Sequence, residues 1–251
     1  MNLLAIDTAT NRFSVALASE RQGQRDTWLF EADAGIRHSE LVMDGVDILM
    51  QKAALRPSDI DGVVCMGGPG SFTGLRIGFS LAKGLALSLG IPFAPIPTLD
   101  CLAWPFSSWP GIVVPVLDAK KKAFFCALYR KGERICRDMD ATPSEIAIVL
   151  AENLSPQPKP EQALFFGPGA EMLHRELMLL QEDDSNAGNI KAALVHGKGI
   201  RWGNAETLLE VALETRAFDK IDKAEIGDNL FAGPEYIRKS DAELNLSPTR
   251  S

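Results

Sequence analysis

The chain has 251 residues, 46% of them apolar and 24% charged, and its formal net charge is −7. Such a chain can bury a full core in one large domain or two small ones, so a scaffold held together mainly by disulfides is excluded. The net negative charge, with no long acidic or basic runs, argues against a protein that binds nucleic acid mainly through its own contacts with phosphates. We therefore expect any contact with RNA to require a partner.

The first predicted elements form a hairpin with an aspartate at its bend. Residues 3–6 predict a buried strand, residues 7–11 a turn and residues 13–18 a second strand. The chain then continues with a helix over 39–55 capped by Ser39, a strand over 62–66, a glycine-rich loop, a helix over 75–89, and a strand and short helix that reach Trp104.

The next part of the sequence repeats this pattern. Residues 112–117 predict a buried strand that ends at Asp118, and residues 123–129 predict its hairpin partner. Aligning Asp7 with Asp118 pairs Ala16 with Ala127, so we expect two similar halves. The remaining predicted elements are a helix over 144–153, a strand over 163–166, a turn over 167–169, and helices over 170–180 and 204–215. Strands interleaved with helices predict an α/β fold.

The stretch from Gly67 to Gly78 is rich in glycine and leads into a predicted helix. Such a loop can bind an anion through backbone N–H groups, or it can be a tight turn that lets loop and helix pack closely. It is not a P-loop, because the lysine and hydroxyl residue that close a P-loop are missing, and the dinucleotide fingerprint also fails, because Gly74 comes one residue late.

Asp7 and Asp118, each at a strand end, allow two interpretations. They can hold a metal-bound phosphate between the two halves, or each can cap its own turn. The three histidines, His38, His174 and His196, include no helix-spaced pair, so we expect no two-histidine metal site within one helix. No serine or cysteine has an evident base nearby in sequence.

The four cysteines and the start of the chain bear on its compartment. Cys65, Cys101, Cys126 and Cys136 lack Cys-x-x-Cys spacing and lie among apolar residues, so we expect them to be reduced and structural. The apolar stretch before Asp7 is too short for a signal peptide, and no later run is long enough to span a membrane. We expect a cytoplasmic protein.

Four stretches of the sequence together resemble one family, the bacterial TsaB family, formerly called YeaZ. They are Leu4–Thr10, Arg37–Leu41, the glycine loop Gly68–Gly78 and Val116–Lys120. Pro234–Arg238 is in turn similar to the family's C-terminal strand.

The resemblance implies an actin-like (ASKHA) fold of two RNase H-like halves. It divides the chain into a first half over 1–104, which pairs with a partner and onto which 230–238 packs back, a second half over 105–229, and a flexible tail over 239–251.

The resemblance also implies a non-catalytic subunit that supports and activates the transferase TsaD, together with the small ATPase TsaE. That complex transfers a threonylcarbamoyl group from threonylcarbamoyl-AMP to the adenosine next to the anticodon of tRNAs that read ANN codons. TsaD-like proteins carry a metal-binding histidine pair, of which this sequence keeps His38 alone in the equivalent helix. The chain is then expected to form a heterodimer with TsaD, to meet tRNA through the complex, and to form a homodimer when alone.

Three groups of residues are the candidate sites. The nucleotide or phosphate group is Asp7, Thr8, Thr10 and Asp118; the glycine-loop group is Gly68, Gly70, Ser71, Thr73, Gly74 and Arg76; and the partner-interface group is His38, Leu41, Val42, Leu75 and Phe79. We expect no cofactor or metal bound by the chain alone, with ATP or ADP at the interface with the partner. The rival interpretation is an autonomous actin-like ATPase or phosphotransferase that uses both aspartates with magnesium.

Overall fold

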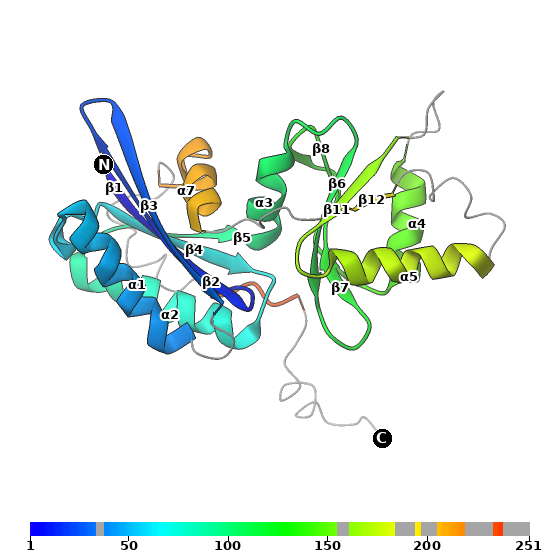
Figure 1. The fold of residues 1–251 in the computed structure, drawn as a ribbon, viewed down its shortest axis with the longest axis horizontal. Coiled ribbons are helices and arrows are strands. Elements are labelled where there is room, and N and C mark those ends of the chain that lie inside the picture. The colour runs from blue at the N-terminus through cyan, green and yellow to red at the C-terminus, as the bar shows by residue number, and fades with distance from the viewer. Residues whose placement is uncertain (34–37, 155–160, 184–193, 197–204, 219–232, 238–251) are drawn as a thin grey trace, which may run out of the picture.

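The protein is described here by a computed structural model, which covers residues 1–33, 38–154, 161–183, 194–196, 205–218 and 233–237 (Figure 1). The strands are β1 (Asn2–Asp7), β2 (Arg12–Arg21), β3 (Gln24–Asp33), β4 (Gly62–Gly68), β5 (Phe93–Pro97), β6 (Ile112–Asp118), β7 (Phe124–Cys126), β8 (Tyr129–Arg130), β9 (Glu133–Arg134), β10 (Met139–Ala141), β11 (Ala163–Phe166) and β12 (Leu194–His196). The α-helices are α1 (His38–Ala53), α2 (Phe72–Leu89), α3 (Thr98–Ala103), α4 (Pro143–Asn153), α5 (Ala170–Asp183) and α7 (Ala205–Glu214).

Two sheets of matching topology form within these described residues. Their strand orders are β3-β2-β1-β4-β5 and β10-β7-β6-β11-β12, with β8 and β9 attached beside β6. In each sheet an antiparallel hairpin is followed by parallel strands: β1 pairs with β4, and β6 pairs with β11. This arrangement confirms the predicted α/β fold of two similar halves.

Helices cover both sheets in layers (Figure 1). In the first half, α1 and α2 pack on one face around a core that includes Phe13, Val46 and Phe79. The other face packs against α7 through Leu3, Ala16 and Leu208. In the second half, α4 and α5 pack on the second sheet around a separate core.

The predicted alignment of the two halves is correct for the first strand of each hairpin. For the second strand of each hairpin, the predicted alignment is off by one residue. Asp7 pairs with Ser14 across β1 and β2, whereas Asp118 pairs with Phe124 across β6 and β7. The second turn is therefore one residue shorter. Ala16 corresponds to Cys126 and not to Ala127, because a one-residue change in the turn moves every later side chain to the other face of the sheet.

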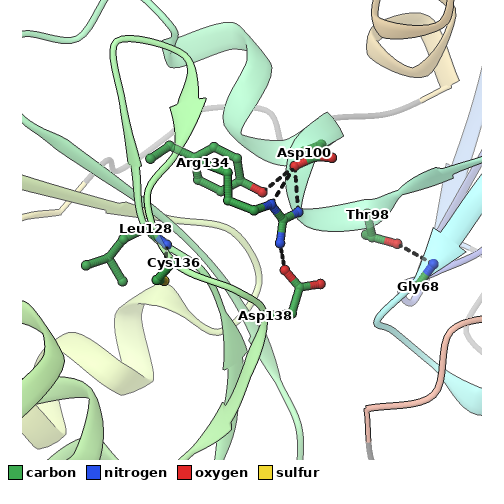
Figure 2. Close-up of polar contacts among 8 residues, drawn as sticks. Gly68, Thr98, Asp100, Leu128, Arg134, Cys136 and Asp138 are labelled. Atoms are coloured by element: carbon green, nitrogen blue, oxygen red, sulfur yellow. Dashed lines mark hydrogen bonds and ion pairs between the residues drawn. The ribbon is translucent and has the colours of Figure 1, made fainter. Parts of the chain in front are cut away.

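One strand predicted in the second half is interrupted, and one long strand of the first half was missed. The single strand expected over 123–129 is interrupted between β7 and β8, where the Leu128 N–H donates to Cys136 Sγ at 3.1 Å (Figure 2) and the Leu128 carbonyl accepts from Ile135 N at 2.8 Å. The long edge strand β3 was not predicted, because its side chains are mostly exposed or half-buried and give little hydrophobic alternation.

Helix α7 lies in a part of the chain that was expected to belong to the second half, 105–229. It instead packs on β1 and β2 of the first half, where the Ala205 N–H donates to Ser14 Oγ at 2.9 Å. The physical reason is that its buried face, with Leu208 and Leu209, covers the open side of the first sheet. The predicted tail over 239–251 lies outside the described residues.

Helix α3 joins the halves and contributes to the cores of both. Cys101 packs in the core under α7, while Leu99, Leu102 and Ala103 pack against the second sheet. Figure 2 shows the polar contacts at its two sides. Thr98 Oγ1 accepts from Gly68 N at 3.2 Å, and Asp100 Oδ1 accepts from Tyr129 OH and Arg134 Nη2, both at 2.6 Å. The helix is therefore bonded to the glycine loop on one side and to the second half on the other.

Candidate functional site

A cleft of about 710 Å³ lies between the two halves, at the ends of the first strand of each hairpin. It is lined by both aspartate hairpins, by the loops that follow β4 and β11, and by the segment 233–237. Its polar and charged lining residues are Thr10, Asn11, Arg12, Asp33, Ser71, Asp118, Lys120, Lys121, Glu235 and Tyr236.

The loops after β4 and β11 have the same sequence, Gly-Pro-Gly, at residues 68–70 and 167–169. The first glycine of each has a positive φ, 111° at Gly68 and 106° at Gly167. A Cβ on the last glycine would lie 2.6 Å from the Ala9 carbonyl oxygen at Gly70, and 2.9 Å from the Asp118 nitrogen at Gly169. The glycines are thus required so that each loop can pack against the aspartate hairpin of its own half.

The rest of the first glycine loop is also used for packing. Ser71 caps α2, with its Oγ accepting from Gly74 N at 3.2 Å. Gly74 lies directly against the backbone of Thr8, whose Oγ1 donates to the Gly74 carbonyl at 2.7 Å. The turn interpretation of the loop is therefore the one that these contacts support.

Both aspartates cap their own turns. Asp7 Oδ1 accepts from Ala9 N at 2.9 Å, and Asp118 Oδ1 accepts from Lys120 N at 2.7 Å. Asp7 is 5% exposed and does not line the cleft, whereas Asp118 lines it and pairs with Lys120 Nζ at 2.7 Å. The geometry thus brings Asp118 and Thr10 into the cleft, and leaves Asp7 and Thr8 beneath its surface.

The two carboxyls differ in their ionisation. Burial raises the pKa of Asp7 to about 7, against the effect of its backbone hydrogen bond. At Asp118 two effects oppose each other. Partial burial favours a higher pKa, but the hydrogen bonds from Lys120 lower it by more, so the pKa of Asp118 lies below its ordinary value. Of the two carboxyls, Asp118 is therefore the one that lies open at the cleft, whereas Asp7 is buried against its own turn.

We predict that Asp7 makes the fold less stable as pH rises from about 4 to about 7. In this window the unfolded carboxyl is ionised and the folded one is protonated, so the unfolded state binds fewer protons and the free energy of unfolding falls. Asp7→Asn should abolish this fall and be the more stable protein above pH 7. Urea unfolding of both proteins between pH 4 and 8 tests this; parallel pH profiles would contradict it.

The predicted interface residues divide into core and surface. Leu75 and Phe79 are 1% and 3% exposed and belong to the core, so their assignment to a contact surface was wrong. Val42 is also largely buried, although it lines a groove of about 620 Å³ between α1 and α2; Leu41 is half-buried.

The side chain of His38 lies outside the described residues. The apolar side chains that these helices expose are Met43, Ile48 and Leu87.

The segment 233–237 contacts β4 and α2 of the first half, on which the resemblance expected residues 230–238 to pack. Glu235 N donates to the Gly67 carbonyl at 2.8 Å, and the rings of Phe72 and Tyr236 lie 4.9 Å apart. Arg76 stacks on Phe72 beside them. Pro234–Arg238 was expected to form a strand, but no strand is present within 233–237, and 238 lies outside the described residues. Only the family resemblance had drawn attention to this segment.

Within the part of the chain that the structure describes, no group of three or more His, Cys, Asp or Glu side chains is arranged to hold a metal ion. Among those same residues, no helix has both the length and the apolar character needed to cross a bilayer.

Comparison with known proteins gives consistent matches. The model of the family described as "TsaD: tRNA N6-adenosine threonylcarbamoyltransferase" matches residues 32–246. The chain is 31% identical over 180 residues to the tRNA threonylcarbamoyladenosine biosynthesis protein TsaB of Bacillus subtilis, covering 71% of this chain and 75% of that protein. It is 32% identical over 135 residues to the protein of the same name from Escherichia coli, covering 53% and 57%.

Among solved structures, YeaZ from Pseudomonas aeruginosa aligns with a TM-score of 0.68 at 23% identity, covering 94% of this chain and 99% of that one. At this level of identity the match supports the fold.

Proposed function

The chain belongs to the TsaB (YeaZ) family, and we propose that it is a non-catalytic subunit in the biosynthesis of threonylcarbamoyladenosine in tRNA. Its role is to bind and activate TsaD, which transfers the threonylcarbamoyl group from threonylcarbamoyl-AMP to the adenosine next to the anticodon of tRNAs that read ANN codons. The names of the relatives support the pathway.

The observation that carries the non-catalytic role is the position of Asp7. Its carboxyl is buried, accepts a hydrogen bond from its own turn and has a pKa of about 7. Phosphoryl transfer in an actin-like cleft depends on carboxylates that hold a metal ion against the phosphates. The rival ATPase or phosphotransferase therefore lacks an open carboxylate from the first hairpin.

We assign the contact with TsaD to α1 and α2. Met43 and Ile48 are each 41% exposed and Leu87 is 69% exposed, and the groove between these helices is lined largely by apolar side chains. Exposed apolar side chains beside a groove favour a protein partner. The core residues Leu75 and Phe79 serve this contact indirectly, because they hold α2 against the first sheet.

Further partners follow from the same role. We propose that TsaE and tRNA meet the chain in the assembled complex, that ATP or ADP binds at the contact with TsaD, and that the free chain forms a homodimer through the same helices. No step is assigned to a nucleotide bound by this chain alone. Because the substrate is tRNA, we place the protein in the cytoplasm.

Reconstitution tests the proposal. A mixture of TsaD, TsaE, the separate synthase, ATP, bicarbonate, threonine and tRNA should form threonylcarbamoyladenosine with this chain and lose nearly all of that activity without it. The modified nucleoside is measured by mass spectrometry after digestion. Activity that is indifferent to the chain, together with ATP hydrolysis by the chain alone that Asp7→Ala abolishes, would establish the rival phosphotransferase instead.

The docking helices can be tested in the same assay. Met43→Glu and Leu87→Glu each place a charge on the exposed face of α1 or α2, and we expect each to weaken binding to TsaD by on the order of 30-fold or more, because the carboxylate would be desolvated without a partner. Ile148→Glu on α4 is the matched control, since Ile148 is 60% exposed on the second half. Equal binding by all three variants would contradict the assignment.

A further inference from the structure

Arg76 is held in place by two aromatic rings from distant parts of the chain. Its guanidinium carbon lies 3.8 Å from the centroid of the Phe72 ring, one turn earlier on α2. Its Nε donates to Tyr236 OH at 3.2 Å, and the two rings themselves lie 4.9 Å apart. A stacked guanidinium with Nε bonded has lost much of its freedom before any ligand arrives, so binding to it costs less entropy.

The two terminal nitrogens of this guanidinium make no hydrogen bond to another described residue. Among the described residues Arg76 has no acidic partner, and its hydrogen bond to Tyr236 uses Nε. The two terminal nitrogens together carry four N–H donors in a planar fork. Such a fork matches the two oxygens of a carboxylate.

The surroundings of Arg76 identify what supplies that carboxylate. Arg76 lines the groove between α1 and α2, whose other lining residues include Val42, Met43, Ile77 and Leu81. An apolar groove with one fixed cation at it suits a protein segment that presents apolar side chains around one acidic residue. It suits a nucleic-acid backbone poorly, because phosphates need several cations and the chain has a net charge of −7.

We propose that Arg76 is the residue that sets the register of the docked partner, by holding one Asp or Glu side chain of the segment that fills this groove. The inference rests on the proposed function, because it takes the segment to belong to TsaD. Phe72 and Tyr236 are positioning residues: they orient the fork, and Tyr236 makes the segment 233–237 part of the docking site although α2 lies far from it in sequence.

The test measures the Kd of the full chain for TsaD by titration calorimetry at low and moderate salt. We expect Arg76→Ala to raise the Kd by on the order of 30-fold, the usual cost of removing one partner of a buried charged pair, and to reduce its salt dependence. Arg76→Lys should recover little of this, because an ammonium lacks the planar fork. Tyr236→Phe should give a smaller loss, since stacking remains. Arg175→Ala is the control. The side chain of Arg175 on α5 is 72% exposed, so this variant should bind like the wild type.

A charge reversal identifies the opposite residue. Arg76→Glu should lose binding, and one acidic-to-arginine substitution among the exposed Asp and Glu residues of TsaD should restore it. If the wild type binds TsaD and Arg76→Ala binds equally well, the Arg76 proposal is overturned while the proposed function stands. If Arg76→Ala weakens tRNA binding but leaves the affinity for TsaD unchanged, the Arg76 proposal is also overturned, in favour of a phosphate contact. Failure of the wild-type chain to bind TsaD would overturn both.

Discussion

Replacing Gly74 by alanine is expected to destabilise the protein by about 3 kcal/mol or more, the upper range for inserting a carbon into a packed site. A Cβ at this position would lie 1.9 Å from the carbonyl oxygen of Thr8. The obstructing atom is backbone in β1's following turn, which cannot rotate away as a flexible side chain would. Helix α2 would have to move off the hairpin, and the hydrogen bond from Thr8 Oγ1 to the Gly74 carbonyl would be lost with it.

Gly84→Ala is the matched control on the same helix. Gly84 is exposed, and a Cβ there would meet no atom within 4 Å. Because glycine weakens a helix interior, this substitution should stabilise the protein by roughly 0.5 to 1 kcal/mol. Urea unfolding followed by circular dichroism measures both free energies. If Gly74→Ala has the same free energy of unfolding as the wild type, the loop does not pack as described.

The second large effect is expected for Leu99→Ala in α3. Leu99 is fully buried and packs with Val113, Tyr129 and Phe166 of the second half. Truncation of a buried leucine costs about 2 to 5 kcal/mol, depending on how far the surroundings collapse into the cavity. Since α3 also belongs to the core under α7, we expect both halves to lose stability together in one transition.

Leu87→Ala supplies the same chemical change at an exposed site. Leu87 is 69% exposed on α2, so its truncation should alter the free energy of unfolding by less than about 0.5 kcal/mol. Tryptophan fluorescence and far-ultraviolet circular dichroism should report coincident midpoints for Leu99→Ala. Two separated transitions would mean that α3 does not join the cores.

Local patterns predicted much of the fold correctly. The apolar strands that end at Asp7 and Asp118, the glycine loop and the end of α2 at Gly90 depend on neighbouring residues, and these features form where expected. The cap predicted at Ser39 was wrong, because α1 already begins at His38. The register of the second hairpin was missed because the two turns differ in length by one residue, which the aligned aspartates conceal. The second Gly-Pro-Gly, at 167–169, was seen as a turn without its match to 68–70.

The candidate site was harder to predict, because its contacts join residues distant in sequence. Asp7 and Asp118 look alike in the sequence, yet Asp7 is buried and Asp118 lies at the cleft. Leu75 and Phe79 share the helical spacing of an interface residue, and spacing alone does not tell which face meets the sheet. The contact of Tyr236 with Arg76 spans 160 positions and has no local signal.

The place of α7 in the fold has a consequence for the order in which the chain matures during synthesis. Every described element of the second half lies between Ile112 and His196, so that half has left the ribosome while residues 205–214 are still inside the exit tunnel. The first sheet, although translated first, keeps the face with Leu3 and Ala16 bare until α7 arrives. The N-terminal half is therefore the last to be completed, against the usual order of domains along a nascent chain, and nascent chains that stop before Ala205 should be the ones that chaperones retain.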